Sequence, residues 1–508
     1  MMKKLIYILP IFALSFSACK KGFLDVNITP NNPVTVPPGL ILSTITTATA
    51  FANSNDLNRA ASLLVQHTAG VANQVAAYDV FFLDGAFDNQ WNFEIYNGAI
   101  NNMRILIDQY AATSPAFSGI AKLQMAYVFA MTTDLWGDVP YSQAGKGLQF
   151  ETPRFDKQED IYQGNASDIT SLFDLVKDGL SDLSKPSVII PNGTSDLVYG
   201  GDLTKWSRMG NALLLKLAIQ ISNRNPALAK STIESVLTGN NFINSNALDF
   251  EVKFGSGVGN RNPVFDFNNN LRTGDMMLSA RLLALSRSLN DTVRLAKFFT
   301  KPNIPAVSGP ATFVAFENGA STAAPALSST VGGVTYIQRS KYNTYLTGTP
   351  EPLISPATGG QAPIRLITFS QVNFILAESA LILNTPGSAN TYFQSGITAS
   401  MQKVGMTTAE ITNYFATNPT VVTLSGTTDQ MRRQIITQKY ISLIGNGIEA
   451  YNDYRRTGYP VLALPLNPSG DNPNVIPTRL PYTPAELARN PLAPKPRPKT
   501  DVKVWWAL

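Results

Sequence analysis

Apolar side chains recur every three or four residues in several stretches of the chain, which is the spacing of one face of an α-helix. One such stripe consists of Tyr96, Ile100, Met103 and Ile107. Further stripes predict helices that follow one another in pairs. The predicted pairs are 94–112 with 116–135, 158–184 with 202–223, and 366–384 with 389–404, and a further helix is expected over 428–445.

Helix pairs that stack on their neighbours are the plan of a helical solenoid. No strict 34-residue tetratricopeptide consensus is visible, so any repeat is degenerate. We therefore predict a mainly α fold, in which degenerate tetratricopeptide-like helical hairpins form a scaffold with long loops and a few short strands. The longest loops are expected as insertions over about 254–275 and 302–362, with short strands at 312–316 and 333–337. Loops of this length usually carry function or are disordered.

The first residues have the pattern of a secretory signal. Two lysines precede an almost wholly apolar stretch from Leu5 to Ala18, which is too short to span a bilayer. The next residue, Cys19, is the only cysteine among 508 residues. A cysteine at the cleavage site resembles a bacterial lipobox, although Phe16 stands where leucine is more usual. An ordinary signal with a stray thiol is the alternative. We predict a signal peptide over 1–18 and lipidation of Cys19.

The stretch after this cysteine, residues 19–39, is expected to be a lipidated tether. Its prolines resist helix formation and favour an extended path. A lipoprotein cysteine normally carries three acyl chains, and more than one chain holds a protein stably on a membrane. The remaining residues, 40–508, show no clear linker and are predicted to form a single domain.

Composition and charge exclude several classes of protein. The chain is 44% hydrophobic and 10% aromatic, as globular proteins are. Its 40 Lys and Arg residues against 35 Asp and Glu residues give a net charge of +5, which is too small to argue for binding of nucleic acid. The most basic stretch, 495–503, is rich in proline and is interpreted as a solvated tail.

Catalytic chemistry has few candidates in this sequence. The single histidine, His67, is expected on a helix as a packed or surface residue, and without a His/Cys cluster no zinc site of the usual type can form. Asp134 and Asp138 keep a glycosidase open as an alternative, because such an enzyme needs two carboxyls about 5 to 10 Å apart. A helix is expected to end at Gly137, so Asp138 should cap or pair in the following turn. We predict no catalytic residue, no metal and no cofactor.

Aromatic and polar side chains alternate in one stretch between two predicted helices, residues 74–91. Aromatic rings cover the C–H face of a sugar, while amides and carboxylates bind its hydroxyl rim, and peptides would use similar groups. The alternative is that these rings fill the core, as most aromatic side chains do. A second aromatic pair lies in the loop over 254–275. The predicted ligand-binding residues are Tyr78, Phe81, Phe82, Asp84, Phe87, Asn89, Phe265 and Phe267.

Seven stretches carry a recognisable series of motifs. They are "DLWGDVPYSQA" (134–144), "WSRMGNALLLKLA" (206–218), "NFILAESAL" (373–381), "GITASM" (396–401), "EAYNDYRRTGYP" (449–460), "IPTRLPYTPAE" (476–486) and "VWW" (504–506). In this order they resemble the SusD/RagB-like outer-membrane lipoproteins, in particular the SusD-like-2 type subgroup. One departure lies in "LNDTVRLAKFF" (289–299), where the family usually shows Asp-Pro-Arg but Asp291 and Arg294 are separated by two other residues.

This resemblance implies a helical tetratricopeptide-type scaffold that carries loops. It also implies an outward-facing, lipid-anchored place on the cell outer membrane, as a lid over a TonB-dependent barrel transporter that resembles SusC. The family captures nutrients, often glycans and in some members peptides, and does not cleave them. Besides the glycan-cleaving alternative, a purely structural surface scaffold stays open.

Several residues within the motifs are interpreted as structural. Trp136 and Trp206 are expected to hold helix packing. Glu378 lies on an apolar helix, and a buried carboxylate needs a partner. We expect Glu378 to pair with Arg455 or Arg456.

Overall fold

The computed structural model describes residues 36–302, 310–348 and 359–508. The predicted signal peptide, Cys19 and most of the predicted tether lie outside these residues. Helices dominate the described part, and its strands are short. The predicted mainly α fold is therefore confirmed. No helix in the described ranges combines the length and the apolar character that crossing a bilayer requires.

The first group of helices contains the first predicted pair. The predicted helix over 94–112 is a π-helix, η1, followed without a break by an α-helix, α5, and its predicted partner is α6. Helix α6 ends at Trp136, and Gly137 follows with a positive φ of 79°, as expected. The helices of this group are α2 (Pro38–Ser54), α3 (Asp56–Leu64), α4 (Asn73–Asp79), η1 (Gln90–Asn101), α5 (Asn102–Tyr110) and α6 (Pro115–Trp136).

The second group differs from its prediction in one place. The helix expected over 158–184 is divided, because the Asn165 side chain accepts hydrogen bonds from the backbone N–H groups of three following residues and fixes a turn there. Asp202 caps the next helix by accepting from the N–H groups of Thr204 and Lys205. The helices are α7 (Gln158–Gln163), α8 (Leu172–Leu183), α9 (Leu203–Gln220) and α10 (Pro226–Gly239).

The third group holds the remaining predicted pair and the last predicted helix. Both members of the pair and the helix over 428–445 are present, with ends that differ by a few residues. Thr427 and Gln430 form a capping box at the start of α19. The helices are α15 (Phe369–Ile382), α16 (Ala389–Lys403), α17 (Thr408–Thr417), α18 (Pro419–Val422), α19 (Thr428–Ser442) and α20 (Gly447–Thr457).

The long segments between these groups hold short elements. Strand β7 confirms the strand expected at 333–337, whereas residues 312–316 form only an isolated bridge at Phe316. The segment over 254–275, expected as a loop, contains two short helices. The short helices are η2 (Gly147–Phe150), η3 (Asn246–Leu248), α11 (Pro263–Phe265), η4 (Asp266–Leu271), α12 (Ala280–Ser288), α13 (Thr292–Phe298), α14 (Thr344–Thr347) and α21 (Pro484–Arg489).

The described strands form four antiparallel pairs. In the hairpin of β6 with β7, Gly332 and Gly333 both have positive φ, which a two-residue turn between strands favours. The other pairs join segments that are distant in sequence, apart from β2 with β3. The pairs are β1 (Thr68–Gly70) with β5 (Met276–Leu278), β2 (Val139–Pro140) with β3 (Phe155–Asp156), β4 (Phe250–Val252) with β8 (Ile364–Ile367), and β6 (Ser328–Val331) with β7 (Val334–Ile337).

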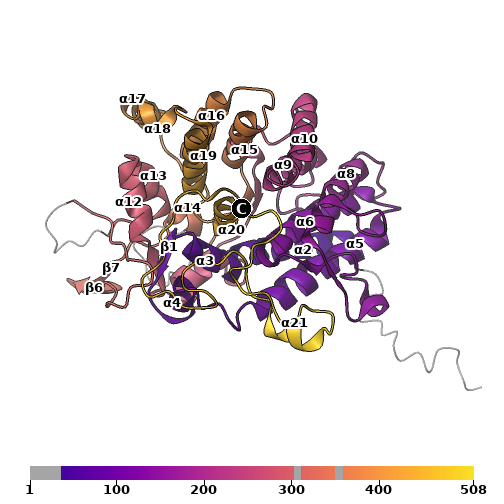
Figure 1. The fold of residues 1–508 in the computed structure, drawn as a ribbon, viewed down its shortest axis with the longest axis horizontal. Helices are drawn as coiled ribbons and strands as arrows, with labels where there is room; N and C mark the ends of the chain where they lie inside the picture. Colours follow the sequence, from indigo (N-terminus) through magenta and orange to yellow (C-terminus); the bar gives the residue numbers. More distant parts are fainter. Residues whose placement is uncertain (1–35, 303–309, 349–358) are drawn as a thin grey trace, which may run out of the picture.

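The helix groups lie side by side, and the hairpin of β6 and β7 lies at one edge of the molecule (Figure 1). Figure 1 shows α8, α9, α15 and α16 in sequence along the upper part of the view, with β6, β7, α4 and α21 along the lower part. One large hydrophobic core joins all three helix groups. Trp136 and Trp206 are fully buried in it, and their indole N–H groups donate to the Pro481 carbonyl and the Asp196 carboxylate. The expectation that both tryptophans hold packing is confirmed.

Candidate functional site

The loop after α4 is held in place by a second, distant loop. The backbone N–H of Ser469 donates to the Val80 carbonyl at 2.6 Å. The next residue, Gly470, has a φ of +97°, and a Cβ added there would lie 2.4 Å from the Phe81 carbonyl oxygen. Only glycine therefore permits this approach of the two loops. The residue after Phe81, Phe82, is 52% exposed.

A hollow of about 250 Å³ lies where these loops meet, and we call it the Phe82 hollow. The Arg497 guanidinium forms a bidentate ion pair with the Asp471 carboxylate, at 2.9 and 3.1 Å. It also donates to the Asp84 carboxylate at 3.1 Å. The hydrogen bonds from Arg497 lower the pKa of Asp471 below its ordinary value. An exposed ring therefore stands beside three fixed charged groups, which together suit the two kinds of surface that a sugar presents.

Of the eight predicted ligand-binding residues, two have exposed side chains in this hollow, Phe82 and Asp84. Asn89 is exposed at the start of η1 but does not line it. Phe267 is half-buried, with the Arg59 guanidinium 4.1 Å from its ring centre. Phe267 does not line the hollow either.

The other four predicted residues have their side chains in the interior. The Tyr78 ring packs against the Phe87 ring, with 5.4 Å between the ring centres, and the Tyr78 hydroxyl donates a hydrogen bond to Asp56. Phe81 and Phe265 are buried as well, although Phe81 contributes to the wall of the Phe82 hollow. These rings fill space between elements, as the alternative interpretation of the aromatic stretch expected, and they offer no open face to a ligand.

Two residues of the Phe82 hollow were missed in the sequence, Asp471 and Arg497. Arg497 lies 413 positions after Asp84, so no local pattern could join them. The only signal was the basic character of residues 495–503, which were interpreted as a solvated tail. That interpretation is wrong for Arg497, because its side chain is only 25% exposed and ion-paired on two sides.

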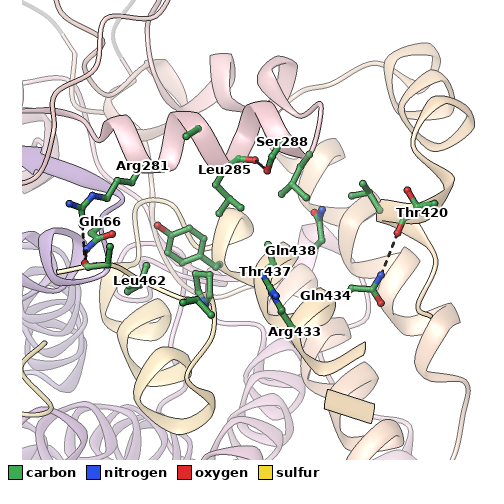
Figure 2. Close-up of a pocket in the computed structure, with 17 residues that line it drawn as sticks. Gln66, Arg281, Leu285, Ser288, Thr420, Arg433, Gln434, Thr437, Gln438 and Leu462 are labelled. Atoms are coloured by element: carbon green, nitrogen blue, oxygen red, sulfur yellow. Dashed lines mark hydrogen bonds between the residues drawn. The ribbon is translucent and has the colours of Figure 1, made fainter. Parts of the chain in front are cut away.

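A larger hollow, of about 510 Å³, lies between α12 and α19 and is drawn in Figure 2; we call it the Arg433 hollow. Its walls combine aliphatic and polar side chains. Arg281 donates to the Ala463 carbonyl at 2.8 Å and to Glu317, and Gln66 also donates to Ala463. The residues that line it are Gln66, Arg281, Ala284, Leu285, Ser288, Leu289, Thr420, Val421, Arg433, Gln434, Thr437, Gln438, Tyr440, Pro460, Val461, Leu462 and Ala463.

Comparison with known proteins decides the family. Residues 30–483 match the model of the family SusD-like_2, described as starch-binding and associating with the outer membrane. The chain belongs to this SusD-like family. A search of curated proteins finds no match.

Solved structures share the SusD-like fold over nearly the whole chain. A chitin-binding protein is 24% identical with a TM-score of 0.72, and the match covers 93% of this chain and 100% of that one. A SusD homologue from Bacteroides uniformis is 21% identical with a TM-score of 0.71, covering 93% and 99%. A chitin-binding SusD homologue from Flavobacterium johnsoniae is 20% identical with a TM-score of 0.68, covering 93% and 97%.

The paired carboxylates of this SusD-like chain do not share a surface. Asp134 is fully buried, and its carboxylate accepts from Tyr162, Asn452 and Trp506 at 2.7 to 3.0 Å. Burial raises the pKa of Asp134 to about 6. Asp138 is exposed and accepts from the N–H of Gln158, so it pairs in the turn after the helix, as expected. A buried and an exposed carboxyl cannot flank one sugar.

The histidine of this chain is a packed residue. His67 lies just after α3, not on a helix as expected, and it is fully buried. Its Nε2 lies 3.0 Å from the Tyr440 carbonyl, and its ring lies 4.2 Å from the Tyr440 ring. Burial lowers the pKa of His67 to about 3. Within the ranges that the structure describes, no three His, Cys, Asp or Glu residues come together as metal ligands would.

Proposed function

We propose that this SusD-like chain captures a glycan at the outer membrane and delivers it to a TonB-dependent barrel transporter that resembles SusC. The family's description as starch-binding supports the glycan, and two structural neighbours are themselves described as chitin-binding. The observation that carries the proposal is the Phe82 hollow, where an exposed ring stands beside the charged groups of Asp84 and Arg497. Phe82, Asp84 and Arg497 are the proposed ligand contacts, and Asn89 and Phe267 stay predictions.

The proposal includes a lipid anchor at Cys19 and an outward-facing position. A captured nutrient must be close to the transporter, and a chain held on the membrane meets a barrel in two dimensions rather than three. The description of the family as associating with the outer membrane supports this placement. Mass spectrometry of the mature protein tests it, because an acylated N-terminal cysteine is expected and a free thiol at Cys19 would contradict it.

The proposed role is binding without cleavage. The strongest enzyme alternative used Asp134 with Asp138, and the burial of Asp134 removes that pair from any surface. Incubation of the purified chain with chitin and starch oligosaccharides should release no new reducing ends. Sustained release that Asp138→Asn abolishes would favour the enzyme.

Binding itself is measurable without knowledge of the native ligand. A ligand that binds only the folded state raises the melting temperature, and at 100 times Kd it stabilises by about 2.7 kcal/mol. We expect a chito- or malto-oligosaccharide to raise the melting temperature of the full chain, and a large barrel to co-purify with it from outer membranes. Oligopeptides form the second arm of the screen. A chain that no glycan or peptide stabilises and that has no barrel partner would be a structural scaffold.

A further inference from the structure

The Arg433 hollow has the size and shape of a binding site for a small molecule. Its volume of about 510 Å³ falls within the 300–1,000 Å³ that ligand pockets usually have. Helix α12 forms one wall and α19 another (Figure 2), and residues 460–463 complete the lining. The rim is open, because Ser288, Arg433 and Val461 are exposed.

Most polar side chains of this hollow are already engaged with the protein. Gln434 donates to the Thr420 carbonyl at 3.3 Å and accepts from the Ser425 N–H at 3.1 Å. Arg281 is held by Glu317 and by the Ala463 carbonyl. These side chains form the walls, and because they already hydrogen-bond to the protein they have little capacity left to bind a ligand.

Two polar side chains of α19 are different. Arg433 and Thr437 are one helical turn apart, so both lie on the face of α19 that borders the hollow (Figure 2). Among the described residues, neither side chain has a hydrogen bond, and Arg433 has no ion pair. The nearest acidic residue along the helix, Asp429, accepts from the Tyr459 hydroxyl at 2.6 Å. No described carboxylate forms an ion pair with Arg433, so its exposed guanidinium is available to an anion at the rim of the hollow.

All charged residues that line the Arg433 hollow are positively charged. Two arginines line the Arg433 hollow, and none of its described lining residues is Asp or Glu. Only Arg281 is neutralised, by Glu317 at 2.5 Å. Arg433 is exposed at the rim, so its attraction for an anion is reached from solvent and is screened by salt.

We propose that the Arg433 hollow is a second ligand site, which binds a sugar unit that carries a carboxylate or sulfate group. The guanidinium of Arg433 meets the anionic group, because its planar fork matches such oxygens. Thr437 meets a neighbouring hydroxyl, and the aliphatic wall of α12 packs on the C–H face of the ring. The choice of a sugar rests on the proposed glycan capture, while the need for an anion rests on the lining alone.

The two hollows differ in the ligand charge that they favour. In the Phe82 hollow, Arg497 is already paired with two carboxylates, so an added anion gains little there. In the Arg433 hollow no described carboxylate pairs with Arg433. Neutral glycan units are thus expected at the first hollow and acidic units at the second.

Titration calorimetry of the full chain tests the second site. The probes are a disaccharide that contains glucuronic acid, its counterpart with glucose in that place, and a counterpart with a 6-sulfate. We expect the two charged disaccharides to bind at least about tenfold more tightly than the neutral one, with an affinity that falls as salt is added. Comparison of the charged pair distinguishes a carboxylate site from a sulfate site.

Variants assign the binding to this hollow. Arg433→Gln removes the unpaired charge and should weaken the acidic disaccharide about tenfold. Arg287→Gln is the matched control, because Arg287 is an exposed arginine of α12 that does not line the hollow, and it should leave affinity unchanged. Phe82→Ala should also leave the acidic disaccharide unaffected, so failure of glycan capture at the Phe82 hollow is distinguishable from failure here.

Three results would overturn the second site. One is equal affinity for the acidic and neutral disaccharides, and another is an unchanged affinity in Arg433→Gln. The third is competition by free sulfate or acetate at the same concentration as the sugar, which would mean that the hollow binds an adventitious ion only.

Discussion

Glu378 on α15 accepts two hydrogen bonds from the guanidinium of Arg456 on α20, at 2.6 and 2.7 Å, and both side chains are fully buried. Arg432 on α19 reaches the same carboxylate at 2.9 Å, so one glutamate joins three helices. The expectation that Glu378 pairs with one of two arginines is confirmed. The other arginine, Arg455, binds the backbone carbonyls of Asp134 and Thr478 instead.

Removal of the Glu378 charge should destabilise the fold strongly. Burial alone would raise the pKa of Glu378, but Arg456 and Arg432 lower it to about 2, so the carboxylate is charged in the folded chain. Glu378→Gln leaves the buried Arg456 with Asp453 as its one described carboxylate partner, and we expect a loss of about 3 to 5 kcal/mol in the free energy of unfolding, measured in urea. The double variant Glu378→Leu with Arg456→Met should lose less. A loss below 1 kcal/mol in Glu378→Gln would contradict this account.

Asp79 should make the stability of the chain fall as pH rises. Burial raises the pKa of Asp79 to about 7, although its carboxylate accepts from Asn318 and from the N–H of Gly319. The folded chain thus binds more protons than the unfolded chain between about pH 4 and 7, and stability declines across that window. Asp79→Asn cannot ionise, so its free energy of unfolding should decline less between pH 5 and 8, by about 1 to 3 kcal/mol. If the free energy of unfolding changed with pH by the same amount in Asp79→Asn and in the parent chain, Asp79 would not be the cause of the decline.

Phe82→Ala should weaken the binding of a neutral glycan by about fivefold to tenfold, because it removes the only exposed ring of the Phe82 hollow. The ring is half exposed, so the melting temperature of the free chain should hardly change. Phe93→Ala is the matched control, since Phe93 is 67% exposed on η1 and lines neither hollow described above. Equal losses of affinity in both variants would place the ligand elsewhere.

Gly470→Ala should separate the two loops that form the Phe82 hollow. The added Cβ meets the Phe81 carbonyl oxygen at 2.4 Å, and the backbone has a φ of +97° that other residues avoid. We expect a loss of about 1 to 3 kcal/mol in the free energy of unfolding and a weaker glycan affinity. Gly257→Ala should be nearly neutral in both measurements, because nothing lies within 4 Å of the added Cβ.

The helices were predictable because their signal is local. The stripe through Tyr96 and Ile107 belongs to one continuous helical segment, and Asp202 caps the helix that it precedes. The division of the helix over 158–184 was not predicted, because the side chain of Asn165 was not recognised as a turn former. Local patterns therefore predict where helices lie better than where they break.

The candidate sites were less predictable, because they join remote segments. The stretch 74–91 was identified by its alternation of rings and acids, but that alternation is the same for Phe82, which is exposed, and Phe87, which is buried. Only packing decides which ring faces outward. The Arg433 hollow gave no signal at all, since its walls come from segments near residues 66, 281, 433 and 461.

The segment from Pro460 to Asp471 belongs to the walls of both hollows, through Pro460 to Ala463 at one end and Ser469 to Asp471 at the other. It contains no helix or strand, and between its ends the Leu466 N–H donates to the Asn318 carbonyl. If both proposed sites bind ligands, a substitution that displaces this segment should weaken the two ligands together. Substitutions in residues 460–471 would therefore not separate the two proposed sites. Only substitutions outside this segment can show whether the two ligands bind independently.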